Sequence, residues 1–558
     1  MLNAGYGRIV QSASGHHFCT CRLTVSAASV QAGNTIHRGY SAGESSSSCS
    51  LSSLLLSCLS MSNLTKTTYL SYSQCAKAFW LTSHQSHLAA PPDPASQRRL
   101  RAGQQVDQLA RAEFPNGRLI PYRPHPQAMA ELTAQAIAEG NDTLFQATFA
   151  PAGMLVKVDI LTPIETDPTD PTIGWHLIEV KSGTSYKPEE HLPDVAFQVY
   201  VLQQAGLVIT QASLMHLNRD YRQRAADEAQ PDQNDLFRLT DITEEVLGYL
   251  PQVVEAVTHM RQTAVLPHSP EVSIGRHCKK PNQCPFYDHC WQDANGWTIY
   301  DIPYLKRPQE EALAAAGIRD VVDIPPDFSL GHKRAAAFVA CVKEAQIDIE
   351  REAIQARLDE LVYPLYFFDF ETIDYAVPLF DGCKPYQQAP FQYSCHILTQ
   401  TGTLHHRDYL HTSTEDPRRP LVESLLDHIG PSGHLVAYNI SFERAVLHHL
   451  ARQFPEYGDR LRDMADRLWD QLAIFRRHYR HHGFARSNSL KAVLPVVVPE
   501  LSYRSLVVQN GMEAQVVWEK MLACTDAAEK QRLVTQLRNY CHLDTLAMVK
   551  IHEALSSL

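Results

Sequence analysis

Apolar and polar positions follow different periods along the chain, and each change of period marks a predicted element. Between residues 66 and 262 the helical spacing of apolar residues predicts helices at 66–80, 101–113, 128–139, 195–204 and 244–262. Between these helices, apolar residues at alternate positions predict strands at Thr143–Phe149, Met154–Leu161, Trp175–Lys181 and Ala212–Leu217. This part of the chain therefore reads as one α/β unit.

A second α/β unit is predicted to follow a helical connector. Residues 301–358 are charged and helical in pattern, with a break at Pro325 and Pro326. The apolar run Leu365–Phe370 then predicts a buried strand, and the other predicted elements of this unit are strands at Phe391–Leu398 and His434–Tyr438 and a long helix at Asp526–Leu555. We expect two α/β domains joined by helices.

Length and composition agree with a multidomain globular protein. The chain has 558 residues, 44% of them hydrophobic and 20% charged, and a net charge of −11. The negative charge argues against a broadly basic surface, although a local basic groove is compatible with it. Its 13 cysteines do not indicate a disulfide scaffold in so long a chain. The sequence contains no run of 18 apolar residues, so it predicts no membrane span. We expect a cytoplasmic protein without a membrane partner.

The first 60 residues differ from the rest of the chain. They are rich in Ser, Gly and Ala and show no hydrophobic period, which is typical of disorder. A coherent pattern begins directly after Met61. We expect residues 1–60 to be a disordered extension or a start placed too far upstream, and to be dispensable.

Two acidic residues of the first unit are predicted to face each other. Asp159 and Glu179 lie almost symmetrically about Thr169, in the turn-forming run Asp167-Pro-Thr-Asp-Pro-Thr, so an antiparallel hairpin places them opposite one another. Lys181 follows Glu179 by two residues and shares its face. Two carboxylates can bind Mg²⁺ or Mn²⁺, and an ammonium group can stabilise developing negative charge. The simpler alternative is a surface hairpin with an acid–lysine pair.

The order of these residues resembles that of the RecB-type PD-(D/E)xK nucleases. Asp159 and the Glu179-Val-Lys181 run are followed by a predicted helix that carries Gln198 and Tyr200. The resemblance implies a catalytic role for all five residues, with Asp159 and Glu179 as metal ligands. Family members often carry a His or Glu in an early helix, where this chain has Asp107; Asp107 and Gln146 are candidates for an additional ligand.

Three cysteines end the first unit at regular spacing. Five residues separate Cys278 from Cys284, and five separate Cys284 from Cys290; Cys75 lies far upstream. One N-terminal and three C-terminal thiolates resemble the iron–sulfur staple of RecB-like nucleases, although the spacing is longer than usual. The resemblance implies a 4Fe–4S cluster held by these four cysteines. Zinc is the alternative, with His277 or His289 able to replace a thiolate.

The second unit carries acids beside a buried strand. Asp369 and Glu371 point to one side of the aromatic run and Phe370 to the other. Charges beside a core strand are costly unless they are paired or bound to metal. Farther along the chain are Glu443, at the start of a predicted helix, and Tyr540 and Asp544, four residues apart on one face of the last helix.

This order resembles the DEDD exonucleases of the ribonuclease H-like fold, in the variant whose last motif reads Y-x-x-x-D. The resemblance implies two Mg²⁺ ions held by Asp369, Glu371, Glu443 and Asp544, with Tyr540 orienting the attacking water. Glu443 departs from the usual aspartate. A ribonuclease H-like domain that binds nucleic acid without cutting it is the alternative.

The whole of residues 61–558 resembles an uncharacterised bacterial family that fuses these two kinds of domain. The runs Leu70-Ser-Tyr-Ser-Gln-Cys-Ala-Lys and Phe367-Phe-Asp-Phe-Glu-Thr carry the resemblance. The expected organisation is an extension (1–60), a RecB-like nuclease domain with the cysteine cluster (61–300), a helical connector (301–358) and a DEDD-type domain (359–558). Because the family includes a domain of unknown function, the resemblance implies architecture but no physiological role.

These features predict a metal-dependent exonuclease that acts on DNA, or on RNA, in repair or defence. The first alternative is a nucleic-acid-binding scaffold with one or both centres inactive, and the second is a zinc-stabilised interaction protein without catalysis. The histidine-rich run from His478 to His482 is predicted to be a solvated helix end, with a metal site as the alternative. It can also contact phosphates, together with Arg476, Arg477 and Arg480.

Overall fold

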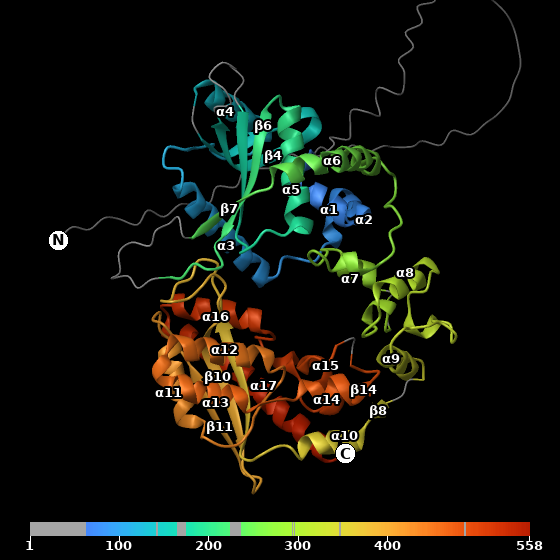
Figure 1. Cartoon of the computed structure of the whole chain (residues 1–558), viewed down its shortest axis with the longest axis vertical. Helices are drawn as coiled ribbons and strands as arrows, with labels where there is room; N and C mark the ends of the chain where they lie inside the picture. Colours follow the sequence, from blue (N-terminus) through green and yellow to red (C-terminus); the bar gives the residue numbers. More distant parts are fainter. Residues whose placement is uncertain are drawn as a thin grey trace, which may run out of the picture. The chain divides into compact units, whose positions relative to one another are not determined.

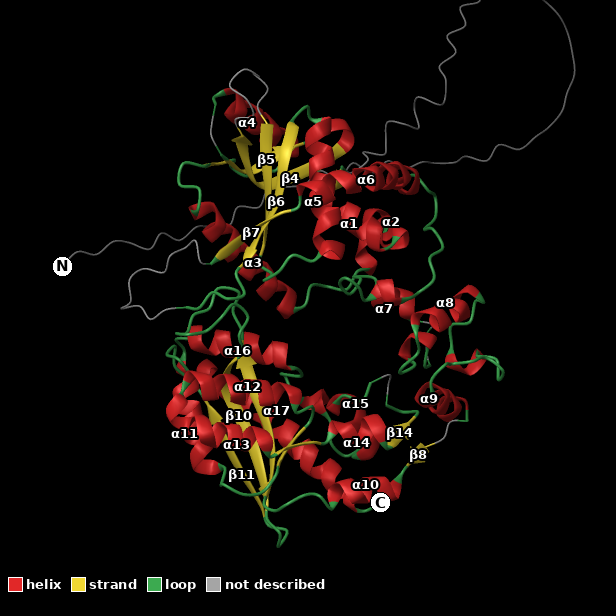
Figure 2. Ribbon diagram, in the orientation of Figure 1, coloured by secondary structure: helices red, strands yellow, loops and turns green. Residues whose placement is uncertain are grey.

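The computed structural model describes residues 63–140, 143–164, 174–223, 236–292, 294, 296–344, 347–484 and 487–558. They belong to a compact unit that spans Met61–Leu558, a mixed α/β structure with several sheets (Figures 1 and 2). The predicted extension at 1–60 and the predicted turn at 167–172 lie outside the described residues. No helix within the described ranges is long and apolar enough to cross a membrane.

The first sheet contains seven strands in the described part of the chain. Their order is β2-β3-β4-β5-β6-β7, and β1 pairs with β4. The strands are β1 (Leu64–Thr65), β2 (Arg118–Leu119), β3 (Leu144–Phe149), β4 (Met154–Ile164), β5 (Gly174–Lys181), β6 (Val208–Leu217) and β7 (Phe237–Asp241). Strands β3 to β6 occupy the four stretches predicted from alternation. The shortest strands, β1 and β2, have too few residues to show a period.

Helices cover both faces of the first sheet. They are α1 (Lys66–Gln74), α2 (Ala76–His84), α3 (Pro94–Ala112), α4 (Pro126–Ala138), α5 (Pro188–Gln204) and α6 (Thr243–Ala264). Leu177 packs in one cluster with Val199 of α5 and Val253 of α6. Ile178, the next residue of β5, packs in another cluster with Val106 of α3. Successive side chains of a strand point to opposite faces, so β5 is buried on both sides.

The segment between the sheets is mainly helical, as its pattern predicts. It contains α7 (Tyr287–Trp291), α8 (Arg307–Ala315), α9 (Lys333–Lys343) and α10 (Arg351–Leu358). It also contains the short strand β8 (Ile347–Ile349), which pairs antiparallel with β14 (Tyr479–His481). The His478–His482 run, predicted to be a helix end, therefore includes a strand. Three residues are too few to show a period, so pairing with a distant segment decides their conformation.

The second sheet has the order β11-β10-β9-β12-β13. These strands are β9 (Leu365–Ile373), β10 (Ala389–Leu398), β11 (Leu404–Leu410), β12 (Leu435–Ala437) and β13 (Leu468–Asp470). The accompanying helices are α11 (Arg418–His428), α12 (Ser441–Gln453), α13 (Gly458–Asp466), α14 (Leu472–Arg477), α15 (Leu490–Val497), α16 (Gly511–Ala523) and α17 (Ala527–Ser556). Phe367 packs with residues of α15, α16 and α17, whereas Phe368 packs with residues of α11, α12 and α13. The sheet therefore lies between two helical layers.

Candidate functional site

The first acidic group is built on the β4–β5 hairpin and on helix α5. Ile160 pairs with Ile178, so Asp159 and Glu179 are the next residues on the two strands. Lys181 Nζ lies 2.6 Å from Glu179 Oε1, which places both side chains on one face of β5. The alternation of the strand thus brings the two carboxylates and the lysine together.

Glu179 is the centre of this group and is only 1% exposed. Its Oε1 accepts hydrogen bonds from Lys181 and, at 2.7 Å, from Lys66; its Oε2 accepts one at 2.7 Å from Gln198. Burial alone would raise the pKa of Glu179, but the ammonium groups of Lys181 and Lys66 outweigh burial and lower that pKa below its usual range. Glu179 is therefore held ionised.

Asp194 completes the group, although the sequence argument did not select it. It lies one turn before Gln198 on α5 and is 2% exposed. Its carboxylate lies 2.5 Å from Lys181 Nζ and 3.4 Å from Lys66 Nζ, and it accepts a hydrogen bond from Gln198 at 3.0 Å. The four-residue spacing of Asp194 and Gln198 within the apolar middle of α5 was a usable signal. Lys66, from the first turn of α1, gave none.

Asp159 has neutral hydrogen-bond donors instead. Its carboxylate accepts hydrogen bonds from the Val180 backbone N–H at 3.0 Å and from Gln146 Nε2 at 3.2 Å. Burial raises the pKa of Asp159, and the nearby Glu179 raises it further. Gln146 has a φ of 57°, a strained value for a residue with a side chain, and it also donates to Asp107 at 3.2 Å. The two additional candidates, Asp107 and Gln146, are thus linked to the group.

Tyr200 is placed away from this group. It is half-buried and packs against the apolar cluster under the first sheet. Residues two positions apart in a helix are separated by about 200° around its axis. Tyr200 therefore points in a different direction from Gln198. Of the five residues suggested by resemblance for this centre, the structure brings Asp159, Glu179, Lys181 and Gln198 together and leaves Tyr200 apart.

The four cysteines singled out in the sequence line one small cavity. Cys75 joins α1 to α2, and the other three come from the segment around α7; they are Cys278, Cys284 and Cys290. Burial raises the pKa of Cys284, and the other three thiols raise it further. Among the described residues, sets of three metal-binding atoms that all lie within 4.8 Å of one another occur at other places in the chain. The sulfur atoms of the four cysteines therefore converge on one cavity but are more widely separated than the atoms of those sets.

The second acidic group borders a cleft of about 910 Å³ beside strand β9. Asp369 and Glu371 enter the cleft from β9, and Tyr540 and Asp544 enter it from α17. Alternation along the strand and the four-residue spacing on the helix orient the two pairs. The structure thus brings together residues from segments separated by more than 160 positions.

Burial of several like charges dominates the electrostatics of this cleft. Burial raises the pKa of Asp369, and the charges of Asp544, Glu371 and Glu443 raise it further. The pKa of Glu371 is raised by burial and then by Asp544. Without a cation, carboxylates in this arrangement repel one another. The arrangement has the charge and oxygen donors that a divalent cation requires.

Tyr540 is accompanied by two residues that the sequence argument missed. Lys491 Nζ donates to Tyr540 Oη at 3.3 Å and lies over the rings of Tyr540 and Tyr503. Tyr503 Oη donates to Asp544 Oδ1 at 2.6 Å. Burial and the neighbouring acids raise the pKa of Tyr540 far above its usual range, so its hydroxyl stays protonated. A lysine and a second tyrosine have no motif that ties them to Asp544.

Glu443 occupies a different position from the other acids. It lies in the first turn of α12, is 3% exposed and is absent from the lining of the cleft. Its Oε2 has no hydrogen-bond partner within the described ranges, and burial raises its pKa. The nearby Asp470, at the end of β13, differs from Glu443 because its carboxylate has partners: it accepts hydrogen bonds from the backbone N–H groups of Asn439 and Leu472. Glu443 is therefore close enough to influence the centre but is withdrawn from the open cleft.

A second cavity, of about 310 Å³, shares Arg476, Ser487 and Asn488 with the cleft. Its lining is basic and aromatic, and includes Trp297, Tyr304, Arg334, Phe338, Phe475, Arg480, His481, His482 and Phe484. The basic run from Arg476 to His482 thus lies along this cavity. Cationic and aromatic side chains together suit the backbone and bases of a nucleic acid strand.

Comparison with known proteins identifies relatives of undescribed activity. Residues 366–489 match a domain of unknown function, DUF2779. The chain is 26% identical over 208 residues to uncharacterized protein MG366 of Mycoplasma genitalium, covering 33% of this chain and 31% of the relative. It is 29% identical over 208 residues, with the same coverage, to the MG366 homolog of Mycoplasma pneumoniae.

A third relative is uncharacterized protein UU173 of Ureaplasma parvum, which is 26% identical over 249 residues, covering 40% of this chain and 35% of the relative. The chain thus spans about a third of the length of these curated relatives. The matched domain contains Asp369, Glu371 and Glu443 but ends before Lys491 and Tyr540. Similarity therefore supports a relationship to proteins of unknown function, and the chemistry rests on the sites.

Proposed function

We propose that this protein is a metal-dependent nuclease that hydrolyses phosphodiester bonds of DNA, with RNA as the alternative substrate. The observation that carries the proposal is the cleft beside β9. Buried carboxylates there meet a protonated tyrosine and a lysine, and the cleft continues into the basic, aromatic cavity. The proposed assignment of the two domains as RecB-like and DEDD-type rests on the motif resemblances. The proposed role of the protein in repair or defence follows from these assignments.

At the second centre, Asp369, Glu371 and Asp544 would hold Mg²⁺ or Mn²⁺, with Glu443 as a further ligand after a change of rotamer. The ions would polarise the scissile phosphate and lower the pKa of the attacking water. Tyr540 keeps its proton, so it can donate a hydrogen bond that orients this water. Lys491, at 3.3 Å from Tyr540 Oη, fixes the phenol and brings positive charge to the phosphate.

The cavity next to the cleft suits one strand of nucleic acid. Arg476 lines both spaces and Arg334 lines the cavity, so a phosphate backbone can follow positive charge towards the acids. Trp297 and Phe338, whose rings are in edge contact, can stack with bases. These features favour a single-stranded or frayed end as the substrate of the second centre.

The first centre is proposed to hold a metal ion through Asp159 and Glu179. Lys181 would stabilise developing charge on the phosphate, and Gln198 and Asp194 would position Glu179 and Lys181 through their hydrogen bonds. Lys66 already donates to Glu179 and is partly exposed, so it can shift to a phosphate when a cation binds. The mixture of two lysines with three acids fits a site that binds both a cation and an anion.

Cys75, Cys278, Cys284 and Cys290 are proposed to hold a 4Fe–4S cluster, with zinc as the alternative. Their convergence on one cavity fits four thiolate ligands. Zinc with Zn–S bonds of about 2.3 Å needs a tight group of sulfur atoms, whereas a cluster several ångströms across needs a wider one. The spacing of the quartet favours the cluster, which would fasten α1 and α2 to the segment around α7.

Cys284→Ser is expected to remove the cluster. Anaerobically purified wild type should be brown and contain four iron atoms per chain, and Cys284→Ser should lose the colour and most of the iron, with a Tm lower by several degrees. Absorption spectra, iron analysis and thermal melts provide the measurement. Cys524→Ser, which alters a partly buried thiol outside the quartet, is the matched control. Colourless wild type whose zinc content falls by one in Cys284→Ser would identify zinc as the metal of the quartet.

Tyr540→Phe is expected to slow cleavage by about 100-fold, because a misplaced attacking water costs a factor of this size. Binding of a single-stranded oligonucleotide should change by less than about threefold, since the phenol hydroxyl orients water and does not bind the strand. Single-turnover cleavage rates and fluorescence anisotropy separate the two effects. Tyr457→Phe, on a half-buried tyrosine outside the cleft, should leave both values unchanged. Equal rates for Tyr540→Phe and wild type would remove the proposed role.

One observation favours a second candidate function, a nucleic-acid-binding scaffold. Glu443 replaces the usual aspartate of the resembled family, and its carboxylate is withdrawn from the cleft. If that carboxylate cannot reach a metal ion, the second centre binds a strand without cutting it. The two functions differ in a single assay, because a scaffold binds the strand with unchanged length.

The test of the proposed function is digestion of end-labelled single- and double-stranded DNA and RNA by the full chain. Reactions contain Mg²⁺, Mn²⁺ or EDTA, and products are separated by length. A nuclease should shorten at least one substrate with Mg²⁺ or Mn²⁺ and none with EDTA. Binding of every substrate without shortening would support the scaffold instead.

A further inference from the structure

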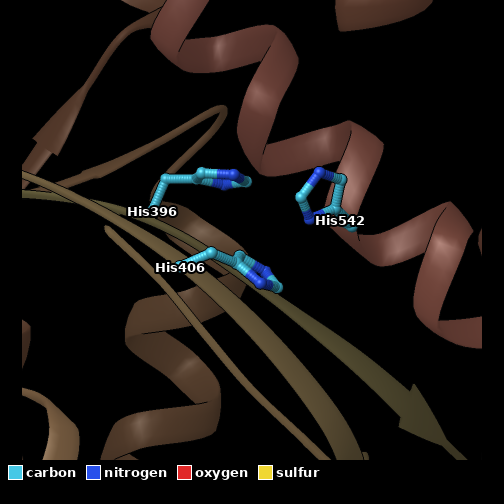
Figure 3. A group of neighbouring side chains, drawn as sticks. All are labelled: His396, His406 and His542. Atoms are coloured by element: carbon cyan, nitrogen blue, oxygen red, sulfur yellow. The ribbon is translucent and has the colours of Figure 1, made fainter. Parts of the chain in front are cut away.

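Three histidines from three different elements meet on the second sheet. His396 comes from β10, His406 from the adjacent strand β11, and His542 from α17. His396 and His406 are directly paired across the two strands, and Figure 3 shows their rings and the ring of His542 turned towards one another. The ring centroids are separated by 4.4 to 4.7 Å. None of these residues belongs to either acidic centre.

The histidine cluster has the geometry of a metal site. One ring nitrogen from each histidine can be chosen so that all three lie within 4.8 Å of one another. A tetrahedral ion with metal–nitrogen bonds of about 2.1 Å needs nitrogens about 3.4 Å apart. His406 and His542 are only partly buried, so small rotations of their rings can close the difference.

Neighbouring hydroxyl groups hold the rings in place. Thr545 Oγ1 lies 2.8 Å from His396 Nδ1, and Ser394 Oγ lies 2.9 Å from His406 Nε2. The two hydroxyls are 2.7 Å apart, so they form one network. Among the residues that the structure describes, this network leaves His396 Nε2 and His406 Nδ1 without a hydrogen-bond partner. Metal-binding histidines commonly use one nitrogen for the ion and the other for such a hydrogen bond.

The ring of His542 and the charge state of the other rings also favour metal binding. The His542 ring has no hydrogen-bond partner in the part of the chain that the structure describes. Burial, and then the other two rings, lowers the pKa of His396 to about 3, and burial also lowers the pKa of His406. At neutral pH these two rings are therefore uncharged and keep a lone pair for a metal ion.

We propose that His396, His406 and His542 form a binding site for a Zn²⁺-type transition-metal ion. Three imidazoles suit Zn²⁺ and its neighbours in the first transition series, whereas the oxygen-rich acidic cleft suits Mg²⁺ or Mn²⁺. Water fills the fourth position, because two of the three histidines are partly exposed.

The ion would fasten helix α17 to the second sheet beside the cleft. On α17, His542 precedes Asp544 by two residues, and Thr545 follows Asp544 directly. On the sheet, Ser394 is paired with Asp369. A bond from His542 through the metal to β10 and β11 therefore limits movement of α17 relative to β9. The inference concerns metal binding alone and holds whether or not the cleft cuts nucleic acid.

Zinc counting on the full chain tests this proposal. Protein stripped with a chelator is loaded with Zn²⁺, freed of excess by gel filtration, and analysed for zinc per chain. His406→Phe and His542→Gln should each retain one zinc fewer than wild type. His405→Phe is the matched control, since His405 is the exposed neighbour of His406 on β11. The cysteine quartet and the acidic centres are unchanged in all four proteins, so any zinc they bind cancels.

Thermal melts supply a second readout, for which wild type and one folded variant are sufficient. Zn²⁺ should raise the Tm of stripped wild type by several degrees, because the ion binds the folded chain, and should raise the Tm of His405→Phe equally. The rise should shrink in whichever of His406→Phe and His542→Gln folds. Equal zinc in wild type and both variants, or wild type whose Tm does not respond to Zn²⁺, would overturn the proposal.

Discussion

Replacing Asp369 with asparagine is expected to reduce cleavage at the second centre by about 10³-fold or more. A metal ion supplies several kcal/mol of transition-state stabilisation, and each 1.4 kcal/mol or so corresponds to a factor of ten in rate. Cleavage should be measured as a single-turnover rate in an Asp159→Asn background, so that the first centre does not contribute. Asp466→Asn, an exposed acid on α13, is the matched control and should retain the rate.

Asp369→Asn should lower the cleavage rate but raise the thermal stability of the metal-free protein. Burial and neighbouring acids raise the pKa of Asp369 in the folded chain. Ionisation of this group therefore lowers the stability of the metal-free protein as pH rises from about 4. In EDTA, Asp369→Asn should melt above wild type at about pH 8 and approach it at about pH 4. Mn²⁺ should then raise the wild-type Tm more. A lower Tm for the variant throughout would contradict the buried-repulsion account.

Replacing Asp159 with asparagine should abolish cleavage at the first centre, again by about 10³-fold or more. In the part of the chain that the structure describes, its carboxylate accepts hydrogen bonds from a backbone N–H and from Gln146 but none from a lysine, whereas Glu179 is already engaged by two lysines. The rate should be measured in an Asp369→Asn background, with Glu131→Gln on α4 as the control. Glu131 is exposed and lies outside the group.

A full rate for Asp159→Asn in that background would show that the first group is an ion-pair network without catalysis. The network itself offers a second check. Asn at position 159 preserves the hydrogen-bonding shape, so the fold of the first sheet should survive and the circular dichroism spectrum should match wild type. A variant that unfolds would instead show that Asp159 is needed for the β4–β5 hairpin.

The convergence of Asp159 with Glu179, and of Asp369 and Glu371 with Asp544, could be predicted because these acids lie on regular elements. Asp369 and Glu371 alternate along one strand, Tyr540 and Asp544 lie four apart on one helix, and each spacing fixes a shared face. The hairpin symmetry of Asp159 and Glu179 worked in the same way, even though the turn between them lies outside the described residues. Local periodicity is thus sufficient to bring acids on one element to one side.

Partners contributed by distant elements were beyond the sequence argument. Lys66 reaches Glu179 from 113 positions away, and Lys491 reaches Tyr540 from 49 positions away, because the packing of helices on the sheets decides these contacts. The strained backbone of Gln146 and the withdrawal of Glu443 also depend on packing. Tyr200 was selected by resemblance alone, and the rotation of α5 leaves it half-buried and away from the acidic group.

The histidine cluster illustrates the same limit. His396, His406 and His542 have no motif spacing, and the chain contains 27 histidines. Pairing of β10 with β11 brings two of them together, and the packing of α17 adds the third. Sheet register across a hairpin can be anticipated from alternation, but the helix that covers the hairpin cannot.

The most direct test of the central claim compares wild type with the double variant Asp159→Asn/Asp369→Asn. Both proteins are incubated with end-labelled single-stranded DNA and Mn²⁺, and the fraction of intact strand is followed with time. Wild type should convert the strand to short products, and the double variant, with a similar melting curve, should leave it intact. Equal digestion by the two proteins, or an intact strand with both, would contradict a nuclease built on these carboxylates.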